Sequence, residues 1–337
     1  MSQAPAQAMS EQNGMRRATI AVVLVVALAL PFAISGYQTF QLSQVAIYAI
    51  ALLGLNLLTG VNGQISLGHG AFFAIGGYAA AILIVKFHVP YGVAIVIAGL
   101  VCFAAGFLFG LPALRLGGLY LALATFALAL ETPQLLKFKA FDAYTGGVQG
   151  LLLSKPKAPF GLPLTRDQWL YFVCLAFAAP LFWAAANLVR SRIGRALIAI
   201  RDHPIAAETM GVDASLYKTT TFGVSAAFTG VAGGLMSLIV GFVSPDSFGL
   251  FLSLSFVVGI VVGGLASIPG VVVGALFIEF VPNFADRLSD VFGESAKAMP
   301  WAIYGLLLIL IMYAAPTGAA GAARKLATAV TRRRAAG

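Results

Sequence analysis

Long apolar stretches, separated by short polar or charged connections, run along almost the whole chain. The stretches are continuous rather than alternating, and most approach the about 20 apolar residues that a helix needs to cross a bilayer. The pattern therefore predicts an all-α polytopic membrane protein. About ten spanning helices are expected, at 18–36, 42–60, 64–85, 91–111, 116–136, 168–189, 218–241, 251–267, 270–285 and 299–315.

The apolar block 42–85 has to break near its polar centre. As one straight helix its 44 residues would extend about twice the thickness of a bilayer. Its centre combines several glycines, which weaken a helix, with polar side chains at or near membrane depth. One interpretation is a broken or re-entrant element near 60–70 that lines a solute path; the other is a tight turn between two spans. The candidate path residues are Asn56, Asn62, Gln64, Ser66 and His69.

A second break of small residues, 263–270, falls on the same predicted side as the first. Pairs of glycines four residues apart, as at Gly106 and Gly110 or Gly259 and Gly263, let helix backbones approach closely in lipid. We interpret these pairs as general packing surfaces rather than as a dimer seam.

Composition supports a membrane protein and excludes several kinds of chemistry. Hydrophobic residues make up 60% of the chain and charged residues 10%, far from the average of soluble domains. The sequence has no phosphate-binding GxxxxGK[ST] loop, no HExxH and no CxxC, and Cys102 and Cys174 lie in apolar runs. We therefore expect no enzyme activity, no metal and no cofactor, and any energy for transport has to come from another protein.

The distribution of lysine and arginine predicts the orientation. Thirteen of the 21 basic residues fall on the side that holds both termini, so that side is expected to be cytoplasmic. This gives a cytoplasmic tail at 1–17, a permease domain at 18–315 with a turn-rich periplasmic loop at 137–167, and a basic cytoplasmic tail at 316–337. Attraction to anionic membrane lipid explains that tail without nucleic acid.

A charged segment, 190–218, stands between two uncharged stretches and is expected on the cytoplasmic side. It carries five basic and three acidic residues. Ile193, Leu197 and Ile200 share one helical face, which predicts a short surface helix. Asp202-His203-Pro204 predicts the start of a second helix and Gly211 its end. We call this segment the cytoplasmic island. We expect it to form a compact projection that a soluble domain can bind.

Two acidic residues lie inside predicted spans, Glu131 and Glu279. A carboxylate within a membrane is a functional candidate, but both lie near the outer span ends, where interfacial water can reach them. Their roles stay open.

Two blocks, 54–83 and 191–235, carry a resemblance to a known family. The first contains GQISLGHG, and the second is the cytoplasmic island with the span after it. The chain resembles the branched-chain amino-acid ABC transporter permeases of the LivM-like type. The resemblance implies a bacterial inner-membrane subunit that pairs with a second, LivH-like permease, two cytoplasmic ATPase subunits and a periplasmic solute-binding protein.

The resemblance also implies that 205–211 is the coupling loop that importers dock on their ATPases. Ala206, Ala207 and Gly211 match the family pattern, whereas Ile205 stands where the pattern has a glutamate. Acidic contacts would then come from Glu208 or Asp202. The full set of coupling candidates is Arg195, Arg201, Asp202, Ala206, Ala207, Glu208 and Gly211.

Two functions follow from these features. The first is the permease subunit of an importer that passes branched-chain amino acids, or a related small polar solute such as an amide or urea, by alternating access driven by separate ATPases. The alternative is a stand-alone secondary carrier or channel. Proton or sodium coupling would favour carboxylates deep within the spans, and the two candidates here are shallow.

Overall fold

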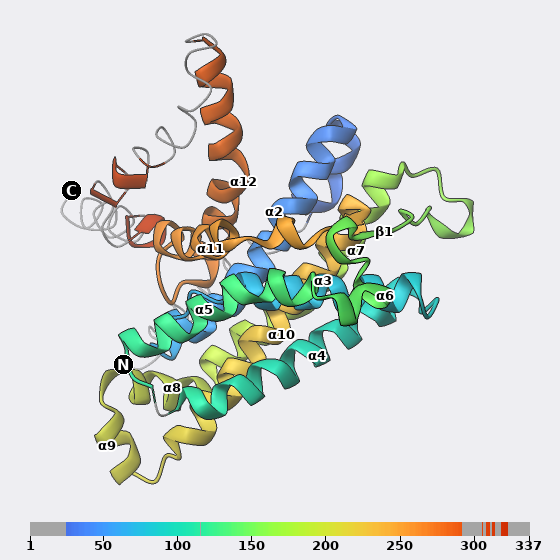
Figure 1. Ribbon diagram of the computed structural model, residues 1–337. Helices are drawn as coiled ribbons and strands as arrows, with labels where there is room; N and C mark the ends of the chain where they lie inside the picture. Colours follow the sequence, from blue (N-terminus) through green and yellow to red (C-terminus); the bar gives the residue numbers. More distant parts are fainter. Residues whose placement is uncertain are drawn as a thin grey trace, which may run out of the picture.

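The computed structural model describes residues 25–114 and 116–291, together with short pieces between 305 and 322 (Figure 1). Six helical segments are long and apolar enough to cross a membrane, and two shorter apolar helices accompany them. The six are α2 (Gly36–Leu55) with its π-helical extension Asn56–Val61, α4 (Tyr91–Ala113), α5 (Leu119–Leu136), α7 (Arg166–Arg190), α10 (Ala214–Val240) and α11 (Leu250–Gly263) with the preceding turn Pro245–Phe248. The two shorter apolar helices are α3 (His69–Val85) and the Ile268–Phe284 part of α12 (Ile268–Val291).

These eight helices correspond one to one with the second to ninth predicted spans. The predicted first and tenth spans, 18–36 and 299–315, lie partly outside the described residues, and so does the tail 316–337. The tail 1–17 and Arg115 lie wholly outside them. The all-helical, multi-pass architecture expected from the apolar pattern is thus confirmed for the described part of the chain.

The central helix of the bundle is α10, which packs against α2, α3 and α4. Small residues allow these contacts, because a Cβ atom on Gly76 of α3 would lie 2.2 Å from the Gly230 carbonyl oxygen of α10. A Cβ atom on Gly106 of α4 would likewise lie 2.4 Å from the Ala226 Cβ of α10. The glycine pairs named above therefore meet helices of the same chain, as general packing surfaces should.

Connections that share a predicted side of the membrane meet at the same end of the bundle. Figure 1 shows α8 (Arg192–Asp202) and α9 (Pro204–Thr209) at the opposite end from α6 (Asp142–Thr145) and the strand β1 (Leu151–Leu152). The first break and the cytoplasmic island are joined at one end by a bond from Arg201 to Gly60. We call this the island end and the other the loop end.

The loop 137–167 is ordered and rich in turns, as the sequence predicts. It contains α6, β1 and the short 3₁₀ turns Lys139–Phe141, Gly147–Gln149 and Pro159–Gly161. The strand β1 pairs antiparallel with β2 (Phe242–Val243), which follows α10. Lys137 also forms an ion pair with Asp246. The loop is therefore fastened to the α10–α11 connection and caps this end of the bundle.

Replacing Gly76 with alanine tests the close contact between α3 and α10. The new Cβ would meet backbone at 2.2 Å, so the helices have to separate, at a cost of about 1–3 kcal/mol for overpacking. Gly92→Ala is the matched control, because a Cβ there meets nothing within 4 Å. We expect thermal unfolding in detergent to show a clearly lower midpoint for Gly76→Ala alone. Equal midpoints for the two variants would contradict this packing.

Candidate functional site

The break between α2 and α3 is the most unusual backbone segment in the membrane region. α2 widens into a π-helix at Asn56–Val61, residues 62–68 are not helical, and α3 begins at His69. The backbone amides of Asn62 and Gln64 still donate to the backbone carbonyls of Leu57 and Leu58, respectively, at 3.1 Å each. Seven residues without helix exceed a tight turn, so a broken element describes this segment better.

The glycines of this segment allow other elements to approach its backbone. A Cβ atom on any of them would lie 2.3–2.6 Å from an atom of another element or, for Gly60, also of the Asn56 side chain. Gly63 also takes a φ of 76°, which favours glycine. The elements that approach are α10 at Gly54, the α11–α12 connection at Gly60, α8 at Gly63, α5 at Gly68 and α11 at Gly70. The break is therefore the point where these elements converge.

His69 ties the break to the central helix. Its Nδ1 lies 3.0 Å from Ser66 Oγ and its Nε2 lies 2.6 Å from Ser225 Oγ of α10. Ser225 Oγ donates in turn to the Gly54 carbonyl at 2.6 Å. The Gly68 amide donates to Ser66 Oγ at 3.3 Å. His69 and both serines are at most 1% exposed, so the network is closed to solvent.

The hydrogen-bond directions assign the proton of His69. A carbonyl only accepts, so Ser225 gives its hydroxyl proton to Gly54 and has to accept from His69 Nε2. In the neutral ring Nδ1 is then an acceptor, so Ser66 donates its hydroxyl proton to Nδ1 while it accepts from the Gly68 amide. One neutral tautomer, protonated on Nε2, satisfies every member of the network. His69 is thus placed as a clamp between the break and α10.

Asn56 connects the first break to the second. Its Oδ1 accepts a bond of 2.8 Å from the Ala266 amide in the α11–α12 connection. Ala266 has a φ of 58°, a region that residues other than glycine seldom adopt. The buried Asn56 amide therefore holds a strained turn against the π-helix.

Arg201 connects the cytoplasmic island to the same π-helix. Its Nη1 donates to the Gly60 carbonyl at 2.9 Å, and a Cβ on Gly63 would lie 2.5 Å from its Cγ. Its Nε donates to Asp202 at 2.8 Å, and this hydrogen bond lowers the pKa of the Asp202 carboxyl. The guanidinium thus spans from an exposed carboxylate of the island to the backbone of the break.

The island forms two short helices around His203-Pro204, as predicted. They fold over a small core made by Ile200, Ala207 and Ala214. The predicted apolar face is partly wrong, because Ile193 is 48% exposed whereas Gly194 is buried with Leu197 and Ile200. Gly194 replaces Ile193 there because α8 meets the end of α7 too closely for a side chain, with Val189 carbonyl oxygen 2.2 Å from its Cβ position.

The coupling candidates occupy different environments in the island. Ala207 is buried, and Gly211 takes a φ of 83° where α9 ends. These two matches to the family pattern therefore hold the island's own fold. The candidates whose side chains are exposed are Arg195, Arg201, Asp202, Ala206 and Glu208.

Sequence reasoning missed two residues at the tip of the island. Ile205, near the start of α9, is 79% exposed and Met210, just after its end, is 85% exposed. Two large apolar side chains this exposed on a small knob make it a candidate contact surface. The signal in the sequence was a large apolar residue at each end of 205–210, and only Ile205 was noted, as a departure from the family pattern.

The path candidates divide into two groups. Asn62 and Gln64 line a cavity of about 210 Å³ at the island end, together with Arg201 and Lys218. The Asn62 amide nitrogen donates to Gln64 at 2.9 Å, and its Oδ1 is buried without a hydrogen-bond partner. Asn56, Ser66 and His69 are instead enclosed by the packing of the two breaks and α10.

The two acidic residues of the spans also differ. Glu131 is exposed on α5, whereas Glu279 on α12 is 7% exposed. No group of three His, Cys, Asp or Glu residues in the described part of the chain is placed to hold a metal ion.

Comparison with known proteins identifies similar chains. The family model described as "Branched-chain amino acid transport system / permease component" matches residues 38–315. The high-affinity branched-chain amino acid transport system permease protein LivM of Salmonella typhimurium is 34% identical, over 88% of this chain and 73% of that protein. LivM of Escherichia coli K12 is 33% identical over 89% and 73%, and BraD of Pseudomonas aeruginosa is 26% identical over 81% and 91%. No solved structure matches the chain significantly.

Removing the Ser225 hydroxyl tests the His69 clamp. Ser225→Ala leaves the buried Nε2 proton of His69 unpaired, which costs about 1–3 kcal/mol. Ser237→Ala is the control, because this buried serine on the same helix bonds only to the Gly234 carbonyl of its own turn. We expect a lower thermal midpoint for Ser225→Ala than for Ser237→Ala. Equal midpoints would contradict the assigned role of His69.

Proposed function

The chain belongs to the branched-chain amino acid transport permease family, and from that premise we propose that it carries solute inward by alternating access driven by separate ATPases. As a family member it is a multi-pass permease component of an ABC transport system and is not itself an enzyme. We propose branched-chain amino acids as its solutes, because the similar permeases are named for them.

We propose that the complete transporter contains a second permease, two cytoplasmic ATPases and a periplasmic solute-binding protein. The two ends of the bundle suit this assembly. The island end exposes a small folded knob, and the loop end carries an ordered cap fastened by β1 and β2. The positive-inside distribution supports a cytoplasmic island end, with the cap and the binding protein on the periplasmic side.

The Arg201–Gly60 bond is the observation that carries the coupling mechanism. Movement of the island reaches the π-helix through this bond, and Asn56 carries it on to the α11–α12 connection. Two interrupted helices then move with the island. Asn62 and Gln64 lie on the cavity between the first break, the α4–α5 connection and α8. We propose that these two residues line the cytoplasmic end of the solute path, while Asn56, Ser66 and His69 hold its walls.

We propose that the tip of the island docks on the ATPase. Ile205 and Met210 supply apolar contact area, and Arg195, Asp202 and Glu208 add exposed charges to the island. An apolar centre with a polar rim is the usual composition of a specific protein interface. Ala207 and Gly211 contribute indirectly, because they shape the knob.

Replacing Arg201 with leucine tests the coupling. The complex should still assemble and hydrolyse ATP, because Arg201 faces the break rather than the docking tip. The amount of solute carried per ATP hydrolysed should fall about tenfold, which corresponds to about 1.4 kcal/mol of lost coupling free energy. Arg192→Leu, exposed on the same helix, should leave this ratio unchanged. Parallel measurements of uptake and hydrolysis in proteoliposomes check both, and an unchanged ratio in Arg201→Leu would contradict the mechanism.

Charging the tip tests the docking surface. Ile205→Asp puts a carboxylate into an apolar contact, so the ATPase should no longer co-purify with the permease. Ile205→Leu keeps the apolar character and should retain the ATPase. Retention by both variants would show that this tip is not the docking surface.

A further inference from the structure

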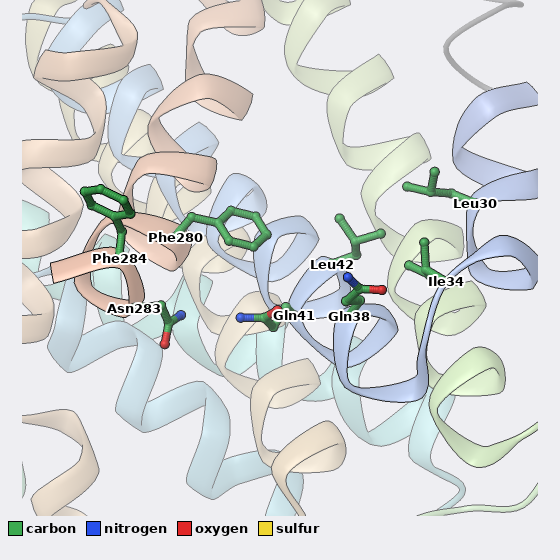
Figure 2. Close-up of a pocket in the computed structure, with 8 residues that line it drawn as sticks. All are labelled: Leu30, Ile34, Gln38, Gln41, Leu42, Phe280, Asn283 and Phe284. Atoms are coloured by element: carbon green, nitrogen blue, oxygen red, sulfur yellow. The ribbon is translucent and has the colours of Figure 1, made fainter. Parts of the chain in front are cut away.

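A cavity of about 480 Å³ lies between α2, α12 and the helix that precedes α2 (Figure 2). Five apolar side chains and three amides line it. The amides are Gln38 and Gln41 of α2 and Asn283 of α12. The volume falls within the about 300–1,000 Å³ of small-molecule sites, which are mostly apolar with a few placed polar groups.

In the Gln38 and Asn283 side-chain amides, neighbouring groups bond to one polar atom and leave the other available to the cavity. Gln38 Oε1 accepts from the Ser35 amide at 3.1 Å and from the Ser35 hydroxyl at 3.2 Å. The Gln38 NH₂ group has no partner within the described part of the chain. Asn283 Nδ2 donates to the Glu279 carbonyl at 2.6 Å. The side-chain oxygen of Asn283, Oδ1, has no hydrogen-bond partner among the described residues. The cavity therefore presents one free donor group and one free acceptor.

Gln41 adds a second acceptor. Figure 2 shows its side-chain nitrogen leading from α2 toward α12, the helix that carries the interacting Glu279 carboxyl. A carboxylate pairs with the nitrogen end of an amide, so the Gln41 oxygen is left for the cavity. Glu279 is the one charged side chain that the described part of the chain buries, and a carboxylate placed within a membrane is functional by default. Here it orients an amide at the cavity wall.

The cavity lies at the loop end of the bundle. Gln168, at the start of α7, donates to the Pro31 carbonyl at 2.9 Å. Lys155 of the loop 137–167 lies over the Phe40 ring at 5.3 Å. The first turns of α2 therefore lie beside the loop that the proposed orientation puts in the periplasm, where solute arrives.

We propose that this cavity is a solute site that binds a zwitterionic aliphatic amino acid. The Gln41 and Asn283 oxygens accept from the ammonium group, and the Gln38 NH₂ group donates to the carboxylate. The apolar walls, Phe280 and Leu42 among them, hold the aliphatic side chain. This inference rests on the proposed importer function and adds to it the place where the permease receives solute.

Thiol labelling tests the site, because Cys102 and Cys174 are both buried and should contribute little background. Gln38→Cys lines the cavity, and Tyr37→Cys is the control, since Tyr37 is the neighbouring residue, is 61% exposed and does not line the cavity. The complete transporter in nanodiscs is labelled with a membrane-impermeant maleimide in the presence of L-leucine or urea. Each solute is added either free or bound to the solute-binding protein.

Leucine at ten times the concentration that half-saturates the site should slow labelling of Gln38→Cys about tenfold. The reason is that the fraction of unoccupied sites falls as 1/(1 + [L]/Kd), where [L] is the free leucine concentration. Tyr37→Cys should label at an unchanged rate. Equal rates with and without leucine at Gln38→Cys would overturn the proposal, and protection by urea alone would overturn the zwitterionic class. Asn283→Cys repeats the test from α12 should Gln38→Cys fail to assemble.

A separate measurement keeps this proposal distinct from the importer function. ATP-dependent leucine uptake by the unmodified transporter is measured first. Uptake without protection at Gln38→Cys or Asn283→Cys contradicts the site alone. Absence of uptake with solute and ATP contradicts the importer function itself. Gln38→Leu with Asn283→Leu should lower uptake while ATPase co-purification stays intact, and unchanged uptake would count against the site.

Discussion

A helix that stops inside a packed bundle has to satisfy its backbone polar groups with other parts of the protein, and this constraint organises the molecule. The chain meets it at the break between α2 and α3. The π-helix keeps some backbone amides bonded, and glycines let neighbouring elements contact the backbone. His69 joins Ser66 of the break to Ser225 of α10 in one hydrogen-bond network. The break is therefore a junction where five elements meet, rather than a loop.

Such a junction can transmit a movement of the island to several helices at once. As a permease component of an ABC transport system, the chain receives the work of transport from outside. In the proposed mechanism the island receives it on a knob shaped by Ala207 and Gly211, and Arg201 passes it to the Gly60 carbonyl. The solute site proposed between α2 and α12 lies at the other end of the same α2 helix, which makes α2 the common member of both.

Much of this architecture could be predicted from the sequence, because apolar windows and helix-breaking residues act locally. Eight predicted spans correspond to helices, and the break and the two island helices lie where glycine, proline and charge indicated. Features that depend on tertiary packing could not be predicted. Gly194 rather than Ile193 is buried because α7 ends beside it. Arg201 and Gly60 are 141 residues apart, and Gln41 and Asn283 still further, so neither pairing leaves a local signal.

The central claim is that the island and the break move as one unit, and distances between spin labels test it most directly. Labels at Ile65→Cys and Thr209→Cys report on the break and the island, and Tyr144→Cys with Thr209→Cys reports on the length of the bundle. In the complete transporter, the 65–209 distance should be the same with and without ATP, while the 144–209 distance changes. A 65–209 distance that shifts as much as the 144–209 distance would contradict the account.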